Sequence, residues 1–189
     1  MATPATLMRC CDMNHYDDDD ERDPEFDEDG DSSEEGLIWQ LLRLINPGDE
    51  DTALQQFDVW REAIEHGDGG EVDAVETMAR VIDWRSGFYV DAGDPRALVQ
   101  ALDELCMRWN LSIDWNGDPD DDDFLADADA ASLLATAYDR LAEHGYTVWA
   151  WETGGDSYAG WITLTRDSEP LRELATALHI NLRLGSELS

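Results

Sequence analysis

The sequence predicts an α+β fold, with a helical N-terminal part followed by an antiparallel sheet that two helices cover. Three observations lead to this class. Apolar residues recur at helical spacing from Leu37 to Ile82, short alternating runs rich in branched and aromatic residues follow from Phe88, and Gly- or Asp-rich turns separate those runs. From residue 111 the expected order is strand, helix, strand, strand, helix, strand. This is the order of a ferredoxin-like split βαβ sandwich, in which both helices lie on one face of the sheet.

The helical part is expected over residues 36–84. Its first helix, 37–45, runs into the sequence Asn-Pro-Gly, which stops a helix. A second helix, 51–66, is followed by Gly67, a residue suited to the turn that ends a helix. A third helix is expected over 71–83, where apolar residues again lie one turn apart. The sequence therefore predicts three consecutive helices before the first strand.

The sheet-containing part is expected over residues 85–189, in one domain with the helices (36–189). Asp94 and Pro95 predict a helix start, because Asp caps a helix N-terminus and Pro fits the first helical position. A Gly-Gly pair between two alternating runs predicts a hairpin. The expected strands are 87–91, 111–115, 146–152, 160–165 and 180–184, and the expected helices are 95–109, 129–141 and 168–178, with the segment at 87–91 as an added edge strand.

Charge is distributed unevenly along the 189 residues, whose formal net charge is −33. Residues 1–35 are expected to be a disordered acidic tail, because 17–35 carry thirteen acids against one Arg (net −12) and offer a single aromatic residue to bury. Residues 36–189 carry thirty-one acids and ten Arg, a net charge of −21. The acidity therefore belongs mainly to the expected domain, and it is attained without a single Lys.

This charge excludes several classes of partner. Phosphate backbones and anionic membrane surfaces repel such a protein, so we expect neither direct nucleic-acid binding nor membrane binding. The first residues lack a basic segment followed by an apolar core, and three cysteines are too few and too unevenly placed for a disulfide framework. Both features favour a cytoplasmic protein. The sequence indicates no cofactor-binding motif and no metal site, and it leaves the oligomeric state open.

The densest group of unusual residues lies between His144 and Trp161. One interpretation is a hairpin whose aromatic side chains pair across the strands, with Trp149 and Trp151 on one core-facing side. The other is a site at the hairpin mouth, where two carboxylates among aromatic rings bind a cation, a sugar or an Arg-rich partner, or act with His144 as acid and base. The candidate residues of such a site are Trp151, Glu152, Gly154, Gly155, Asp156, Tyr158 and Trp161.

The same residues carry a family resemblance. The segment from His144 to Thr163 fits the pattern HGYTxWxW[DE]TGGDxYxGWIT and resembles an uncharacterised bacterial family of acidic proteins, a domain of unknown function. The likeness covers roughly residues 80–187. It implies a bacterial protein and brings no activity with it.

Three hypotheses of function follow from the sequence. The first is a non-enzymatic acidic binding protein that neutralises or regulates a basic protein partner, in the manner of an immunity protein or an inhibitor. The second is an enzyme or cation-binding protein that uses the carboxylates of the hairpin spanning Trp151 to Trp161. In the third, the acidity reflects a saline habitat or genome composition, and the function is unknown.

Overall fold

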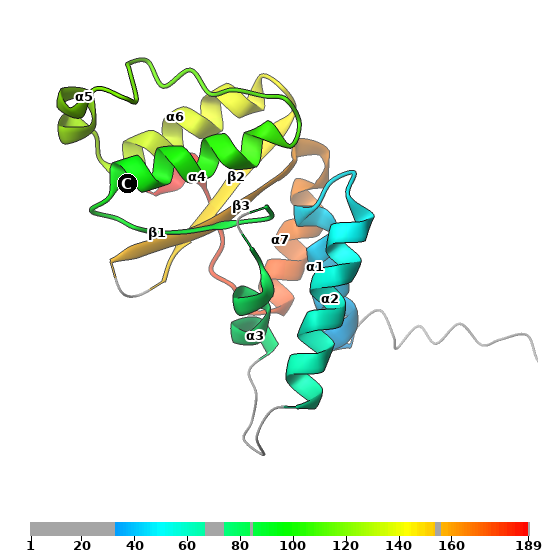
Figure 1. Cartoon of the computed structure of the whole chain (residues 1–189). Helices are drawn as coiled ribbons and strands as arrows, with labels where there is room; N and C mark the ends of the chain where they lie inside the picture. The colour runs from blue at the N-terminus through cyan, green and yellow to red at the C-terminus, as the bar shows by residue number, and fades with distance from the viewer. Residues whose placement is uncertain (1–32, 67–73, 84, 154–155, 189) are drawn as a thin grey trace, which may run out of the picture.

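The computed structural model describes residues 33–66, 74–83, 85–153 and 156–188, which form a sheet with helices on both faces (Figure 1). The elements confirm the α+β class, with helices first and the sheet after them. The helices are α1 (Glu34–Ile45), α2 (Glu50–Glu65), α3 (Ala74–Val81), α4 (Pro95–Met107), α5 (Asp122–Asp127), α6 (Ala130–Ala142) and α7 (Ser168–Ala177), the 3-10 turns are η1 (Thr165–Asp167) and η2 (Gly185–Glu187), and the strands are β1 (Phe88–Asp91), β2 (Tyr146–Glu152), β3 (Ser157–Leu164) and β4 (Arg183–Leu184).

The four strands are ordered β1-β3-β2-β4, and each neighbouring pair is antiparallel. The hairpin β2–β3 places Trp149 opposite Trp161, as the turn sequence predicts. The strand expected around Phe88 is β1, and it lies at the edge of the sheet beside β3. Since β3 separates β1 from β2, the chain makes one split βαβ unit through α4 and α6.

The strand expected at 111–115 is not present, so the ferredoxin-like order from residue 111 is not confirmed. The segment does alternate: Ile113 and Trp115 are buried, whereas Ser112 and Asp114 are exposed. The alternation comes from packing against helices, because the buried residues belong to a core built largely from α4 and α6. The indole of Trp115 also donates a hydrogen bond from Nε1 to the carboxylate of Asp103 on α4 (3.2 Å).

The two faces of the sheet carry separate cores, because successive side chains of a strand point to opposite faces. Val148, Ala150 and Ile162 pack with α4 and α6. Trp149 and Trp161 pack with α1, α2 and α7. The helices expected at 129–141 and 168–178 therefore cover opposite faces rather than one.

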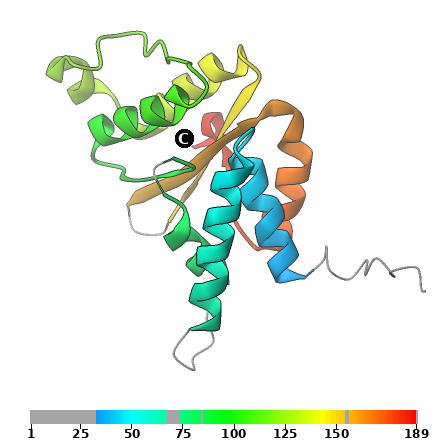
Figure 2. The ribbon, with the colours of Figure 1, turned by 45° about the vertical axis from the view of Figure 1, so that its right-hand side comes forward.

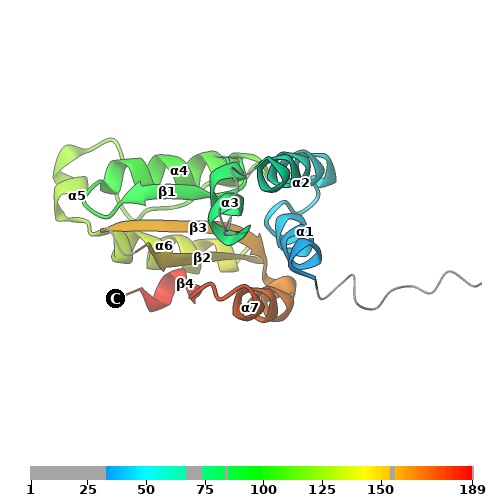
Figure 3. The ribbon, with the colours of Figure 1, turned by 90° about the horizontal axis from the view of Figure 1, so that it is seen from below.

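The N-terminal helices gather with α7 at one end of the strands (Figure 3). In Figure 2, α1 lies between α2 and α7. Ser33 caps α1 by accepting a hydrogen bond from the backbone N–H of Gly36, and Asp49 caps α2 in the same way through Thr52. We call the face that bears Trp149 and Trp161 the second face of the sheet. On this face, α3 lies nearer the β2–β3 hairpin than α1 and α2 do (Figure 3). Trp151, near the β2–β3 turn, is the half-buried tryptophan of this face.

Candidate functional site

Trp151 and Trp161 lie together on the second face of the sheet. Their ring centroids are 4.8 Å apart and the rings are tilted by 57°. Trp161 is completely buried, while Trp151 is half-buried at the edge of the same core. Trp149 shares this face and is also buried, so the prediction that the aromatic face of β2 contributes to the core is confirmed.

Of the other residues predicted for the hairpin site, the structure describes the side chains of Tyr158 and Asp156, and neither belongs to the core that contains the two tryptophans. Tyr158 packs against the core of the opposite face. Asp156 is exposed at the turn with a φ of 54°, and its carbonyl accepts a hydrogen bond from the backbone N–H of Ala92 (2.8 Å). Gly154 and Gly155 lie outside the described residues, as does the side chain of Glu152.

A cavity of about 320 Å³ adjoins the two tryptophans. We call it the β1–α3 pocket, because β1, β3 and the end of α3 form most of its wall and α4 completes it. The lining residues that bear on its chemistry are Phe88, Tyr89, Trp151, Trp161, Asp83 and Glu104. The pocket is therefore walled by aromatic rings, and its two ionisable charged groups are both carboxylic acids.

Tyr89 forms the exposed side of this pocket. Its neighbours Phe88 and Val90 point into the first core, so alternation turns Tyr89 to the second face, where it is 70% exposed. Hydrogen bonds with the side chains of Thr153 and Ser157 lower the pKa of the Tyr89 phenol. The phenol therefore lies beside the hairpin, at the pocket mouth.

The two carboxylates of the pocket differ in their partners. Asp83 is held by Arg85, whose Nε and Nη2 donate to Asp83 Oδ2 at 3.0 and 2.8 Å. Glu104 is exposed on α4, and it forms no ion pair with any residue in the described part of the chain. Glu104 is thus the carboxylate that remains open to an incoming charge.

Groups suited to catalysis do not converge in the described residues. Burial raises the pKa of the Cys106 thiol to about 12, with the Asp103 charge adding to the effect, so the nucleophilic thiolate is strongly disfavoured. His144 precedes β2 and Asp156 follows its other end, so the length of that strand, roughly 20 Å, separates them. Within the described ranges, no three His, Cys, Asp or Glu side chains gather as metal ligands would.

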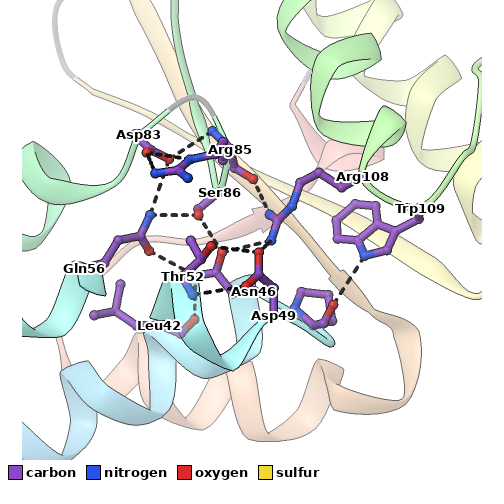
Figure 4. A network of polar contacts seen from close by, with 11 residues as sticks. Leu42, Asn46, Asp49, Thr52, Gln56, Asp83, Arg85, Ser86, Arg108 and Trp109 are labelled. Carbon is purple, nitrogen blue, oxygen red and sulfur yellow. Dashed lines mark hydrogen bonds and ion pairs between the residues drawn. The ribbon is translucent and has the colours of Figure 1, made fainter. Parts of the chain in front are cut away.

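A buried polar network joins the α1–α2 turn to the start of β1 and the end of α4 (Figure 4). Asn46 is its centre. Its Nδ2 donates to Leu42 O (2.9 Å) and to Gln56 Oε1 (3.0 Å). Its Oδ1 accepts from Ser86 Oγ (2.6 Å) and from Arg108 Nη2 (3.1 Å). Each hydrogen-bonding group of the Asn46 amide is used, and this indicates a structural role.

Arg108 ties this network to α4. Its guanidinium donates to the carbonyl of Arg85 and lies 3.6 Å from Asp49 Oδ2. Burial lowers the pKa of Arg108, an effect that the Asp49 charge opposes. Hydrogen bonds from Thr52 hold the pKa of Asp49 below its usual value. Both groups therefore stay charged near neutrality and hold the helical part against the sheet.

Comparison with known protein families identifies the family of this chain. A family model described as "Domain of unknown function (DUF6630)" matches residues 37–185. The chain belongs to the DUF6630 family. The DUF6630 match includes α2 and α1 from Leu37 onward, so it extends well before the region around residue 80 where the motif resemblance begins. It also contains every strand and the whole β1–α3 pocket. No curated protein and no solved structure matches the chain.

Sequence reasoning named two residues of the pocket, Trp151 and Trp161, and missed Tyr89, Asp83 and Glu104. These three come from segments remote from the hairpin in sequence, so local patterns do not connect them with it. The alternation Phe88-Tyr89-Val90 does hold a usable signal, because it predicts that Tyr89 points away from its apolar neighbours. No helix in the described part of the chain has the length and apolar character needed to cross a membrane.

Proposed function

We propose that this DUF6630 protein is a non-enzymatic acidic binding protein that neutralises or regulates a basic protein partner. The observation that carries the proposal is how its arginines are used. Nine of the ten arginines after residue 35 already form an ion pair with a carboxylate of the same chain, and they are Arg43, Arg61, Arg80, Arg85, Arg96, Arg108, Arg140, Arg166 and Arg172. The net charge of −21 over residues 36–189 is therefore an excess of carboxylates, and in the described residues nearly every arginine is already paired.

The excess is most concentrated in the segment that contains α5. Eight aspartates between residues 114 and 129 are all exposed: Asp114, Asp118, Asp120, Asp121, Asp122, Asp123, Asp127 and Asp129. Four of the eight accept hydrogen bonds from backbone N–H groups two or three residues later and so hold the segment in shape. Arg96 pairs with Asp122. This segment offers a basic surface a dense and locally ordered set of negative charges.

Such a surface acts mainly on the rate of association. Complementary charge raises the encounter rate of two proteins by one to three orders of magnitude at low salt, and the gain falls as salt screens the field. Inhibition of a basic protein then needs only that the docked acidic surface cover its working face. The proposal places the protein in the cytoplasm, which is supported by the free, buried thiol of Cys106.

The test uses the full chain as bait in extract of its own cell at low salt. A basic protein recovered in this way is purified, and its association rate is measured against salt. We expect the rate to fall about tenfold or more between 50 and 500 mM salt. The variant Asp120→Asn/Asp122→Asn/Asp123→Asn/Asp127→Asn is expected to associate more slowly and with a weaker salt dependence. Recovery of no basic protein, or equal rates for the two chains, contradicts the proposal.

A further inference from the structure

In the described part of the chain, three tryptophan rings have an arginine of the same chain over them. The guanidinium carbon lies 5.9 Å from the Trp39 ring centroid for Arg43, 5.2 Å from Trp109 for Arg108, and 5.3 Å from Trp149 for Arg172. These distances are within the range over which a cation is attracted to the face of an aromatic ring. The chain thus pairs tryptophan with arginine repeatedly, and does so on both faces of the sheet.

The β1–α3 pocket has the same aromatic chemistry without the cation. Among the described residues, none of the arginines lies over the ring of Trp151 or Trp161. Trp151 and the exposed Tyr89 supply the accessible walls, and the buried Trp161 lies behind Trp151. An aromatic enclosure of this kind favours a cationic group, because the faces of the rings carry negative electrostatic potential.

The charges at the pocket favour the same occupant. Arg85 already neutralises Asp83, whereas Glu104 is exposed at the rim. The nearest arginine along α4 is Arg108, one helical turn after Glu104, and it is directed to Asn46 and Asp49 instead. Among the described residues, Glu104 therefore has no counter-charge, and it lies at the edge of an aromatic pocket.

We propose that the β1–α3 pocket receives the guanidinium of an arginine side chain from the partner protein, which stacks on Trp151 beside Tyr89 and pairs with Glu104. This inference rests on the proposed function and identifies the contact that anchors the partner. The cavity of about 320 Å³ is at the small end of ligand sites, which suits one side chain rather than a large ligand. Arginine fits better than lysine, because its planar head both stacks on an aromatic ring and bonds a carboxylate in bidentate geometry.

The first test needs no identified partner. The full chain is titrated with the peptide acetyl-Gly-Arg-Gly-amide and, in parallel, with acetyl-Gly-Lys-Gly-amide, while the indole N–H signals of the tryptophans are followed by NMR. We expect the arginine peptide to shift the signals of Trp151 and Trp161 more than those of Trp39 and Trp60, and to bind about fivefold more tightly than the lysine peptide. Equal affinities, or shifts spread evenly over the tryptophans, overturn the assignment.

Variants locate the contact. Glu104→Gln should weaken binding of the arginine peptide about threefold. The matched control is Glu173→Gln, which removes the same charge from an exposed position on α7 and should leave the affinity unchanged. Trp151→Leu should weaken binding about fivefold, and Trp151→Phe should retain much of it. Because Trp151 also packs against a core, circular dichroism and the thermal midpoint of each variant confirm that it is folded. Equal effects of the Glu104 and Glu173 substitutions overturn the proposal.

The same variants separate this inference from the proposed function. If a basic partner is recovered and its binding depends on salt, but Glu104→Gln binds it as Glu173→Gln does, the pocket assignment fails and the proposed function stands. If no basic partner is recovered while the arginine peptide binds in a manner dependent on Glu104, the proposed function fails and the guanidinium site stands. Loss of partner binding in Glu104→Gln, with the control unchanged, supports both.

Discussion

Phe88 on β1 lies directly opposite Gly160 on β3, and its ring occupies the space beside the glycine that a side chain would fill. A Cβ at position 160 would also meet the carbonyl oxygen of Trp149 on β2. The close approach of three strands therefore requires glycine at this position.

We expect Gly160→Ala to lower the free energy of unfolding by about 3 kcal/mol, because a backbone carbonyl cannot move aside as a flexible side chain does. Denaturant unfolding measures the change. The control is Gly48→Ala, where the added Cβ meets nothing within 4 Å and only the positive φ of 81° is strained, at about 1 kcal/mol. The expectation is wrong if the variant at 160 loses no more than the control.

Asn46 is expected to be the most sensitive polar residue of the network in Figure 4. Asn46→Ala leaves Gln56, Ser86 and Arg108 without one of their partners in a buried setting, and should cost about 3 kcal/mol of unfolding free energy. Asn181→Ala, at an exposed position, should cost less than about 0.5 kcal/mol. Similar losses in the two variants would show that the network contributes little to stability.

Asp103 gives a prediction about pH. Burial raises its pKa above the unfolded value, and the hydrogen bond from Trp115 only partly opposes this. The folded state therefore binds the proton more tightly than the unfolded state. As the pH rises through the unfolded and then the folded pKa, ionisation of Asp103 lowers the free energy of unfolding. Asp103→Asn removes the titration and keeps an oxygen acceptor for Trp115. The stability of the variant relative to the wild type should increase between about pH 3 and pH 7, as measured by urea unfolding. A difference independent of pH contradicts this.

Cys106 is expected to be inert in the folded protein. Its thiol is buried with a pKa of about 12, so a thiol reagent should react with it only as fast as the chain opens. The measurement uses a Cys10→Ser/Cys11→Ser background, in which position 106 is the single cysteine. Adding Met107→Cys, at a neighbouring exposed position, should restore rapid labelling. Rapid labelling of Cys106 without denaturant would contradict its burial.

Salt is expected to raise stability without being required for folding. Screening relieves the repulsion among the carboxylates, while the two cores are apolar and do not depend on salt for their contacts. The unfolding midpoint measured from low to molar NaCl should therefore rise gradually from a folded low-salt state. A chain that unfolds when salt is removed would support a saline origin of its acidity instead.

Local sequence features predicted much of this fold because they act locally. Asp94 and Asp129 begin helices as capping residues, and alternation along β2 assigned Trp149 to the core. The false strand at 111–115 has a strand-like pattern but no neighbouring strand to bond, which sequence periodicity does not reveal. The start of α5 is rich in aspartates, which are typical of turns, yet Asp121 caps a helix there.

The candidate site was less predictable than the fold. Trp151 and Trp161 stood out because tryptophan is rare and the hairpin is short. Glu104 carried no local feature that distinguished it from the other acids of the chain, and only the packing of α4 beside β1 brings it to the pocket. A site assembled from three separate segments is defined by tertiary contacts, which a single sequence does not contain.

The Asn46–Arg108 hydrogen bond has a consequence for the order of events during synthesis. It links residues 62 positions apart, and Ser86 contributes from between them. While the ribosome is still producing α4, α1 and α2 have emerged with their buried polar groups unsatisfied and with the tryptophan face of the sheet not yet made. We therefore expect nascent chains that stop before Arg108 to be digested rapidly by protease, and the N-terminal helices to become resistant only after the C-terminal half is complete.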